Sequence, residues 1–236
     1  MATIVLAGAE PDAKAAAAEL ARLGPSRLHH AGVTIGFAID ERGPRRLMTL
    51  EARGGTLTLE ADEIDRFGAS TILLAPIAAE IDVHAVRAAR GTPVKVAALQ
   101  GWLRSLSPGH GVAPASLVSI APDLASELAA FDLLVASADD LLADGASPAA
   151  QLVALRRRFG PGPTLIVTDG SRGAHVDRPG AELVSTPAQP VAAESTVGAG
   201  DAFAGLVAMQ LGRGVDPVRA ATEAAGRVAD LLAGSG

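Results

Sequence analysis

Short runs of β-branched and aliphatic residues alternate with Ala-, Leu- and Arg-rich segments of helical period along most of the 236-residue chain. Such alternation is typical of βαβ units, in which a helix connects two parallel strands of one sheet. We therefore predict an α/β fold with a mainly parallel central sheet. The predicted strands are residues 3–9, 70–76, 92–99, 131–137 and 163–170, the predicted helices are residues 12–24, 80–90, 122–130, 147–160, 200–212 and 216–233, and residues 173–178 and 181–186 are predicted to form a closing hairpin.

Residues 32–59 interrupt this alternation. Their sequence indicates three short strands, with the segments ERGP and RGG supplying the turn residues between them. An antiparallel insertion of this length would project from the main sheet. Because the chain shows no linker, internal repeat or low-complexity tail, residues 1–236 are predicted to form a single domain that carries the insertion at 32–59.

The composition argues against several classes of protein. Hydrophobic residues make up 49% of the chain, yet no run approaches the ~18 consecutive apolar residues of a membrane span. The first residues, MATIVLAGAEPD, lack the basic start of a signal peptide, and the absence of cysteine excludes disulfides and thiolate metal sites. We therefore expect a cytoplasmic protein that binds no membrane. A net charge of −6 and scattered arginines also argue against nucleic acid as a partner.

A glycine-rich junction, Gly198-Ala199-Gly200-Asp201, stands directly before an apolar segment of helical spacing. The first N–H groups of a helix lack intrahelical acceptors and carry positive partial charge, so glycines at this point would let an anion approach them closely. An acid in the first turn could then accept a proton from a hydroxyl group beside that anion. The structural alternative is that Gly200 caps the helix and Asp201 is a favourable first-turn acid.

Other catalytic patterns are absent or weak. The five histidines show no HxxxH or HxH spacing for zinc, and the chain contains no GxSxG, GxxxxGK[ST] or GxGxxG motif. The single tryptophan, Trp102, is interpreted as a core or pocket-wall residue.

The segment STVGAGDAFAG, residues 195–205, resembles the C-terminal signature of the ribokinase-like (PfkB) carbohydrate kinases. Upstream segments resemble the same family in the expected order: LLVASADDLLADG is similar to its Asn-x-x-Glu segment, and LIVTDGSRGAHV to its strand–Gly–x–x–Gly segment. The insertion at 32–59, with Thr34, Phe37 and Arg46, matches the substrate lid in position and length. The stretch VAALQGWLR resembles a subgroup that includes plant inositol kinases. The resemblance implies a three-layer αβα fold with a small β-hairpin lid.

The resemblance also implies a role for each matching residue. Asp201 would be the general base that deprotonates an alcohol, and the N–H groups of Gly198, Ala199 and Gly200 would form an anion hole for the γ-phosphoryl group of ATP. Asp140 would help to hold Mg²⁺ through water. The residues implied to line the nucleotide are Thr168, Gly170 and Gly173, and those implied to face the acceptor are Gln100 and Arg104.

The chain departs from the family pattern at three places. Family members begin with a strand and a Gly-Gly segment that hold the acceptor, whereas this sequence starts at what resembles their second strand. Ser195 replaces the Asp of DTxGAGD, and Ser137 and Asp140 replace the Asn and Glu of Asn-x-x-Glu. Two functions follow: an ATP- and Mg²⁺-dependent kinase that phosphorylates a sugar, polyol or nucleoside-like alcohol, or a silent nucleotide- or partner-binding protein. Lid hairpins in this family also form dimer interfaces, so a homodimer through the lid is expected.

Overall fold

The computed structural model describes residues 4–21, 26–30, 32–40, 42, 47–88, 90–91, 94–192 and 195–234. Its main sheet has six strands in the order β12-β11-β10-β9-β6-β5. Four of them pair in parallel and the last two pair antiparallel. The strands are β5 (Thr71–Leu74), β6 (Val94–Ala98), β9 (Leu133–Ser137), β10 (Thr164–Thr168), β11 (Ala174–Asp177) and β12 (Val184–Thr186).

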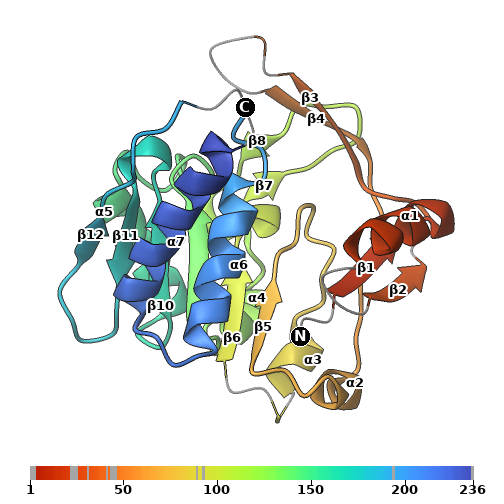
Figure 1. The fold of residues 1–236 in the computed structure, drawn as a ribbon, viewed down its shortest axis with the longest axis horizontal. Helices are drawn as coiled ribbons and strands as arrows, with labels where there is room; N and C mark the ends of the chain where they lie inside the picture. The colour runs from red at the N-terminus through yellow and green to blue at the C-terminus, as the bar shows by residue number, and fades with distance from the viewer. Residues whose placement is uncertain are drawn as a thin grey trace.

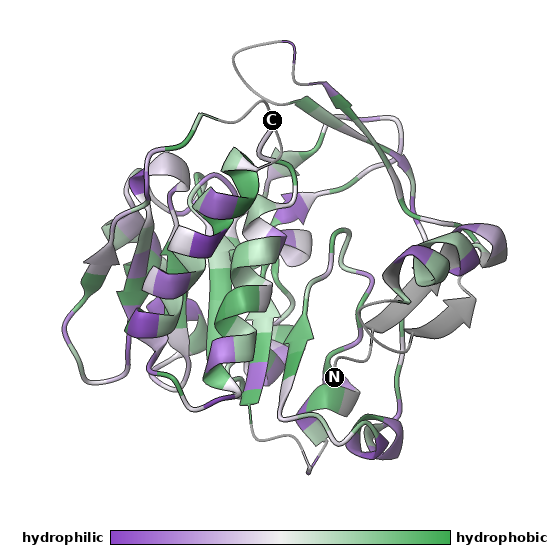
Figure 2. Cartoon of the chain, viewed as in Figure 1, coloured by the Kyte–Doolittle hydropathy of each residue, from purple (hydrophilic) through white to green (hydrophobic). Residues whose placement is uncertain are grey.

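Helices cover both faces of this sheet (Figure 1). On one face, α6 (Ala199–Leu211) and α7 (Pro217–Ala233) bury Phe203 and Val207 against the strands. On the other face lie α3 (His84–Ala88), α4 (Pro122–Leu128) and α5 (Pro148–Phe159), which bury residues such as Val86, Leu128 and Leu155. Figure 2 shows the hydrophobic strands between the two helical layers. The three-layer αβα architecture predicted from the family resemblance is therefore confirmed.

Local sequence signals explain where the helices begin and end. In α5, the Ser147 hydroxyl accepts a hydrogen bond from the Ala150 N–H at 3.3 Å, Pro148 occupies the first turn, and Gly160 follows the last residue at φ +74°. These are an N-cap, a proline start and a glycine stop. At the start of α7, the Asp216 carboxylate accepts from the N–H groups of Val218 and Arg219.

A smaller unit lies beside the main sheet. The strands β1 (Ile4–Gly8) and β2 (Ser26–His30) pair in parallel around α1 (Glu10–Leu20) and do not join the main sheet. The hydroxyl of Thr34 connects this unit to the chain that leads into the lid, because it accepts from the Ala9 N–H at 3.0 Å and donates to the Asp12 carboxylate at 2.5 Å.

The lid is a two-stranded hairpin of β3 (Gly36–Asp40) and β4 (Leu47–Ala52). It arches over the carboxyl ends of the main strands (Figure 1). The outer edge of β4 is tied to the body, because the Gly109 N–H donates to the Leu50 carbonyl at 2.8 Å and the Val112 N–H donates to the Met48 carbonyl at 2.8 Å. These bonds fix the lid to the segment between β7 (Arg104–Ser105) and β8 (Ala113–Pro114). The proposed lid residue Arg46 lies outside the described residues.

One predicted strand is wrong. The third strand of the insertion, expected within residues 56–59, forms only an isolated bridge between Leu57 and Ile81. Leu57 is buried against the body, so the chain leaves the hairpin after β4 to reach the core. Strands β2, β7 and β8, helix α2 (Ala61–Arg66) and the short 3-10 helices η1 (Gln100–Trp102), η2 (Leu117–Ser119) and η3 (Gly170–Arg172) were not predicted.

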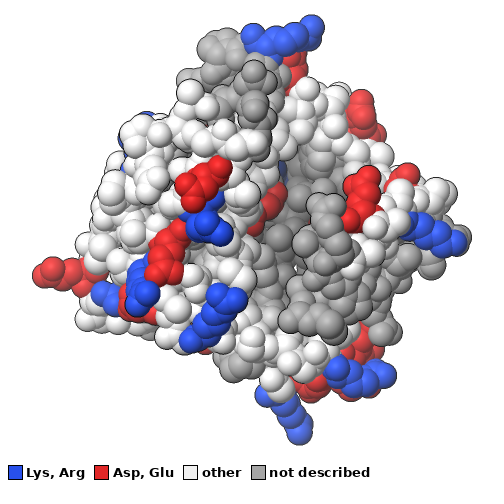
Figure 3. All heavy atoms as spheres, in the orientation of Figure 1, with Lys and Arg blue, Asp and Glu red and all other residues white. Residues whose placement is uncertain are grey.

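Among the described residues, no helix is both long and apolar enough to cross a membrane. Charged residues of both signs lie side by side over α7 on the face shown in Figure 3. One ion pair of this helix joins Arg219 and Glu223 at 2.7 Å.

Candidate active site

Two predicted segments meet at the carboxyl edge of the main sheet. Ser137, the last residue of β9, pairs in register with Thr168, the last residue of β10. The loops that follow these strands carry Asp140 and Gly170, respectively. In open parallel sheets, ligands bind outside the carboxyl ends of the strands, where such loops converge. Topology therefore brings the predicted metal and nucleotide residues to one edge.

The glycine-rich junction forms a set of unoccupied amide donors at the start of α6. Gly198 has φ +81°, a left-handed conformation that favours glycine, and a Cβ atom at Gly198 or Gly200 would meet nothing within 4 Å. Among the described residues, the N–H groups of Gly198, Gly200 and Asp201 have no hydrogen-bond acceptor. We call these three donors the amide cradle. Open space and free donors at a helix start suit an anion.

Ala199, which the family resemblance also placed in the anion hole, differs from these three donors, and its role there stays a prediction. The Ala199 N–H donates to the Thr196 carbonyl at 3.2 Å, so the turn before the helix already uses it.

Asp201 lies in the first turn of α6, directly after the glycines. The residue is exposed to solvent, yet nearby protein atoms displace part of its hydration, and this desolvation raises the pKa of the Asp201 carboxyl. The positive charge of Arg104 lowers the same pKa in part. An accessible carboxylate with a raised pKa suits a general base, because it can both reach and hold a proton.

Arg104 also pairs with Asp140, although the two residues are 36 positions apart. The Arg104 Nε donates to the Asp140 Oδ1 at 2.9 Å, and the two side chains are only 15% and 9% exposed. Burial raises the pKa of Asp140, the Arg104 charge and hydrogen bond lower it in part, and the nearby Asp139 raises it further. Arg104 therefore interacts with Asp140 through a hydrogen bond and with Asp201 through its charge, although these three residues were predicted to have separate roles.

The carboxylates after β9 fit a magnesium ion held mainly by its substrate. Mg²⁺ in phosphate-transfer sites is usually bound through one or two carboxylates together with water and phosphate oxygens. Asp139 is exposed, and Asp140 uses one oxygen for Arg104, which leaves its second oxygen without a partner among the described residues. No group of three or more potential ligand residues occurs in the described part of the chain, so the donor phosphates would have to supply the remaining ligands.

Packing against a neighbouring strand constrains the loop after β10. Gly173 has φ +108°, and a Cβ atom there would lie 2.0 Å from the Thr186 carbonyl oxygen. Neighbouring Gly170, at φ +54°, has open space around it. Packing against β12 therefore explains the glycine at 173, while the nucleotide-binding role of Thr168, Gly170 and Gly173 stays a prediction.

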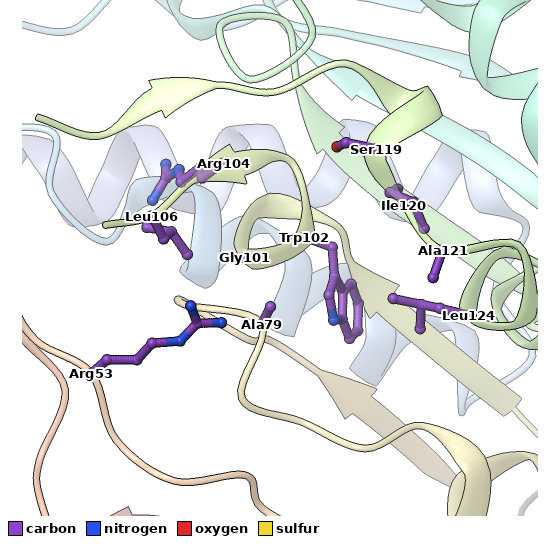
Figure 4. Close-up of a pocket in the computed structure, with 10 residues that line it drawn as sticks. All are labelled: Arg53, Ala79, Gly101, Trp102, Arg104, Leu106, Ser119, Ile120, Ala121 and Leu124. Atoms are coloured by element: carbon purple, nitrogen blue, oxygen red, sulfur yellow. The ribbon is translucent and has the colours of Figure 1, made fainter. Parts of the chain in front are cut away.

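A pocket of about 310 Å³ lies between the body and the chain that leaves the lid after β4 (Figure 4). Arg104 and Trp102 line it, and so does Gly101, whose Cβ position is only 2.6 Å from the Pro76 backbone. Gln100, predicted to face the acceptor, does not line this pocket. Arg53, which enters the pocket from the chain after β4, was not predicted, because the segment RGG was interpreted only as turn residues. The lining residues are Arg53, Ala79, Gly101, Trp102, Arg104, Leu106, Ser119, Ile120, Ala121 and Leu124.

Comparison with known proteins defines the class to which this fold and site belong. The model of the pfkB family of carbohydrate kinases matches residues 109–235, which is more than half of the chain. The chain therefore belongs to the pfkB carbohydrate kinase family. No curated protein matches the chain by sequence.

Solved structures show the same fold over nearly the whole chain. A pyrophosphate-dependent kinase of the ribokinase family, complexed with a pyrophosphate analogue and myo-inositol, is 14% identical with a TM-score of 0.73 over 98% of this chain and 80% of that chain. Ribokinase from Arabidopsis thaliana, complexed with ribose and ATP, is 18% identical with a TM-score of 0.71 over 98% and 75% of the two chains. Adenosine kinase from Schistosoma mansoni, in complex with 2-fluoroadenosine, is 14% identical with a TM-score of 0.70 over 98% and 73%. The fold is ribokinase-like.

Proposed function

We propose that the protein is a kinase that transfers the γ-phosphoryl group of ATP to a hydroxyl group of a sugar, polyol or nucleoside-like acceptor. The observation that carries the proposal is the junction at the start of α6. There, an accessible carboxylate, Asp201, directly follows free N–H groups that open onto unfilled space. Every helix start leaves its first N–H groups without intrahelical acceptors, and this one is distinguished by the open space at its glycines and by the accessible acid in its first turn.

The residues divide the work of the transfer between them. The Asp201 carboxylate accepts the proton of the acceptor hydroxyl as its oxygen forms a bond to the γ-phosphorus and the bond to the leaving ADP oxygen breaks. The amide cradle donates hydrogen bonds to the transferred group as its charge redistributes. The Arg104 charge lowers the pKa of Asp201 in part, which favours the ionised form that a general base needs. Bound Mg²⁺ would neutralise donor phosphate charge, and Asp139 and Asp140 are the residues that would hold it through water.

The structural neighbours support this class of acceptor and leave two donors to compare. Their bound molecules are myo-inositol, ribose and 2-fluoroadenosine, all of which are alcohols. The neighbour that binds myo-inositol is pyrophosphate-dependent, and the neighbour that binds ribose carries ATP. The proposed donor is ATP, and pyrophosphate serves as the competing donor in the test.

The experiment is a transfer assay over a panel of acceptors. Purified protein with Mg²⁺ is incubated with ATP or pyrophosphate and with pentoses, hexoses, inositols, nucleosides and their phosphorylated forms, and phosphorylated products are measured by mass spectrometry. We expect acceptor-dependent ADP formation with at least one class of alcohol. A protein that binds ATP, as measured by a shift in its melting temperature, but forms no phosphorylated product with any acceptor would contradict the proposal.

A further inference from the structure

Two guanidinium groups enter the pocket beside the candidate active site. Arg53 comes from the chain that leaves the lid, and Arg104 comes from β7 in the body. In Figure 4 the Arg53 side chain extends toward Ala79, and Leu106 lies between the two arginines in this view. The pocket therefore collects positive charge from two separate parts of the chain.

Most of the hydrogen-bonding capacity of these arginines is unused. The described residues offer Arg104 one acceptor, the Asp140 Oδ1 bonded to its Nε, and its terminal nitrogens have none. These terminal nitrogens are not among the fully enclosed unpaired atoms of the described residues, so they reach solvent from a side chain that is only 15% exposed. Arg53 is exposed and has no acceptor in the described part of the chain.

The charge balance of the pocket favours an anion. Its lining contains two arginines and no acidic residue. Asp140 offsets the charge of Arg104, which leaves the charge of Arg53 without a partner. Guanidinium groups bind carboxylate and phosphate oxygens in pairs of parallel hydrogen bonds, and such charge-assisted bonds are about twice as strong as neutral ones.

We propose that the acceptor is an alcohol that already carries an oxyanion, either a phosphomonoester or a carboxylate, and that Arg53 and Arg104 bind this group. The inference rests on the proposed kinase function and specifies the substrate class of the same site. Arg104 lies near both the reacting hydroxyl and the oxyanion of such an acceptor, because its charge acts on Asp201 while its side chain lines the pocket. A cavity of about 310 Å³ suits a molecule as small as a sugar phosphate or a sugar acid.

The walls of the pocket are held before any ligand binds. Asp144 accepts from the Ser116 hydroxyl at 2.7 Å and from the Leu117 N–H at 2.9 Å, and Arg158 donates to the carbonyls of Leu117 and Ile120. On the other side, the Glu80 carboxylate accepts from the Ala78 N–H at 2.7 Å and steadies the loop that carries Ala79. A preformed pocket loses little free energy to ordering when it binds a ligand.

The test compares matched acceptors in wild type, Arg53→Gln and the control Arg66→Gln. Arg66 is an exposed arginine of α2 that pairs with Asp62 and does not line the pocket. The acceptor pairs are ribose with ribose 5-phosphate, myo-inositol with myo-inositol 1-phosphate, and glucose with glucuronate. We expect wild type to prefer the charged member of at least one pair, and Arg53→Gln to lower that preference by about 10- to 100-fold, mainly through KM. The phosphate and carboxylate arms identify which oxyanion is used.

A binding measurement separates this inference from the proposed function. Ribose 5-phosphate, myo-inositol 1-phosphate and glucuronate are titrated calorimetrically into wild type, Arg53→Gln and Arg66→Gln, without a phosphoryl donor. Binding of one of these probes that weakens only in Arg53→Gln supports the anionic pocket, even if transfer to every acceptor fails. The inference is overturned if transfer occurs and neutral acceptors are preferred in every pair, or if Arg53→Gln and Arg66→Gln behave alike in both measurements.

Discussion

Gly200 distinguishes an anion site from an ordinary helix cap at the level of one residue. A Cβ atom there would meet no protein atom within 4 Å, and the position is helical, so alanine fits the fold. We expect the added methyl group, however, to crowd an anion bound at the amide cradle. We expect Gly200→Ala to leave the free energy of unfolding unchanged or raise it by up to ~1 kcal/mol, while kcat/KM for transfer falls by about 10-fold or more.

The matched control is Gly205→Ala on the same helix. Gly205 also has open space around its Cβ position, but it lies beyond the first turn of α6. Denaturant unfolding and transfer assays on both variants check the prediction. Equal activity in the two variants would show that the space beside Gly200 holds no reacting group.

Because Arg104 and Asp140 form a largely buried ion pair, we predict that the Arg104→Gln variant loses stability in a pH-dependent way. Arg104→Gln would leave the buried Asp140 carboxylate without its partner, and removing one member of a buried pair costs about 3–5 kcal/mol. Burial already raises the pKa of Asp140, and losing the opposing effects of Arg104 would raise it further. As the pH falls through this raised pKa, the carboxyl becomes neutral and the penalty is relieved. Urea unfolding should therefore show a smaller loss at pH 5 than at pH 8, and an equal loss at both would contradict this account.

Sequence reasoning identified several of these residues and missed others for physical reasons. Asp201 and the glycines before it form one contiguous motif, and its resemblance to the family signature implied their roles. The bond between Arg104 and Asp140 could not be predicted, because it depends on which strands are neighbours. The use of the Ala199 N–H by Thr196 depends on the turn before the helix. Arg53 reaches the pocket only because the chain leaves the hairpin after β4.

The loop between β10 and β11 offers a test at the level of elements. Gly173 lies in this loop, Gly180 lies in the turn between β11 and β12, and both have positive φ. A Cβ atom at 173 would lie 2.0 Å from the Thr186 oxygen, whereas one at 180 would meet nothing within 4 Å. Gly180→Ala should cost about 1–2 kcal/mol of stability, the usual cost of a left-handed alanine. Gly173→Ala should cost at least ~1–3 kcal/mol more, because overpacking adds to the backbone strain. Similar midpoints of thermal unfolding for the two variants would contradict this packing argument.

Helices and strands were predicted from the sequence where their hydrophobic pattern or end signals are strong. Strands β5, β6, β9 and β10 were predicted because they are short runs dominated by aliphatic residues, and α5 because caps mark both of its ends. Strand β2, SRLHH, is too polar to show alternation, and β7 and β8 have only two residues each. The expected third lid strand failed because Leu57 packs into the core instead of pairing with β4.

For the whole molecule, we propose that the lid mediates a homodimer. Ile39 pairs across the hairpin with Met48 and is 45% exposed, so the lid presents an apolar surface that a second copy could cover. Sedimentation of wild type should give the mass of a dimer, and Ile39→Lys should shift it toward the monomer. The control Val153→Lys alters an exposed apolar residue of α5 and should leave the dimer intact. A monomeric wild type at ~50 μM, a concentration at which a micromolar dimer would be largely assembled, would contradict the proposal.

The central claim is tested most directly by the rate of phosphoryl transfer in wild type and Asp201→Asn as a function of pH. The control Asp230→Asn changes an exposed acid of α7 whose side chain is 65% exposed. A general base works only when ionised, and desolvation raises the pKa of Asp201, so wild-type kcat/KM should fall as the pH decreases through a value above that of an ordinary aspartate. We expect Asp201→Asn to lower kcat by about 10²- to 10⁴-fold and to abolish this acid limb, with Asp230→Asn like wild type. Asp201→Asn that transfers phosphate at the wild-type rate, with the same pH profile, would contradict the account.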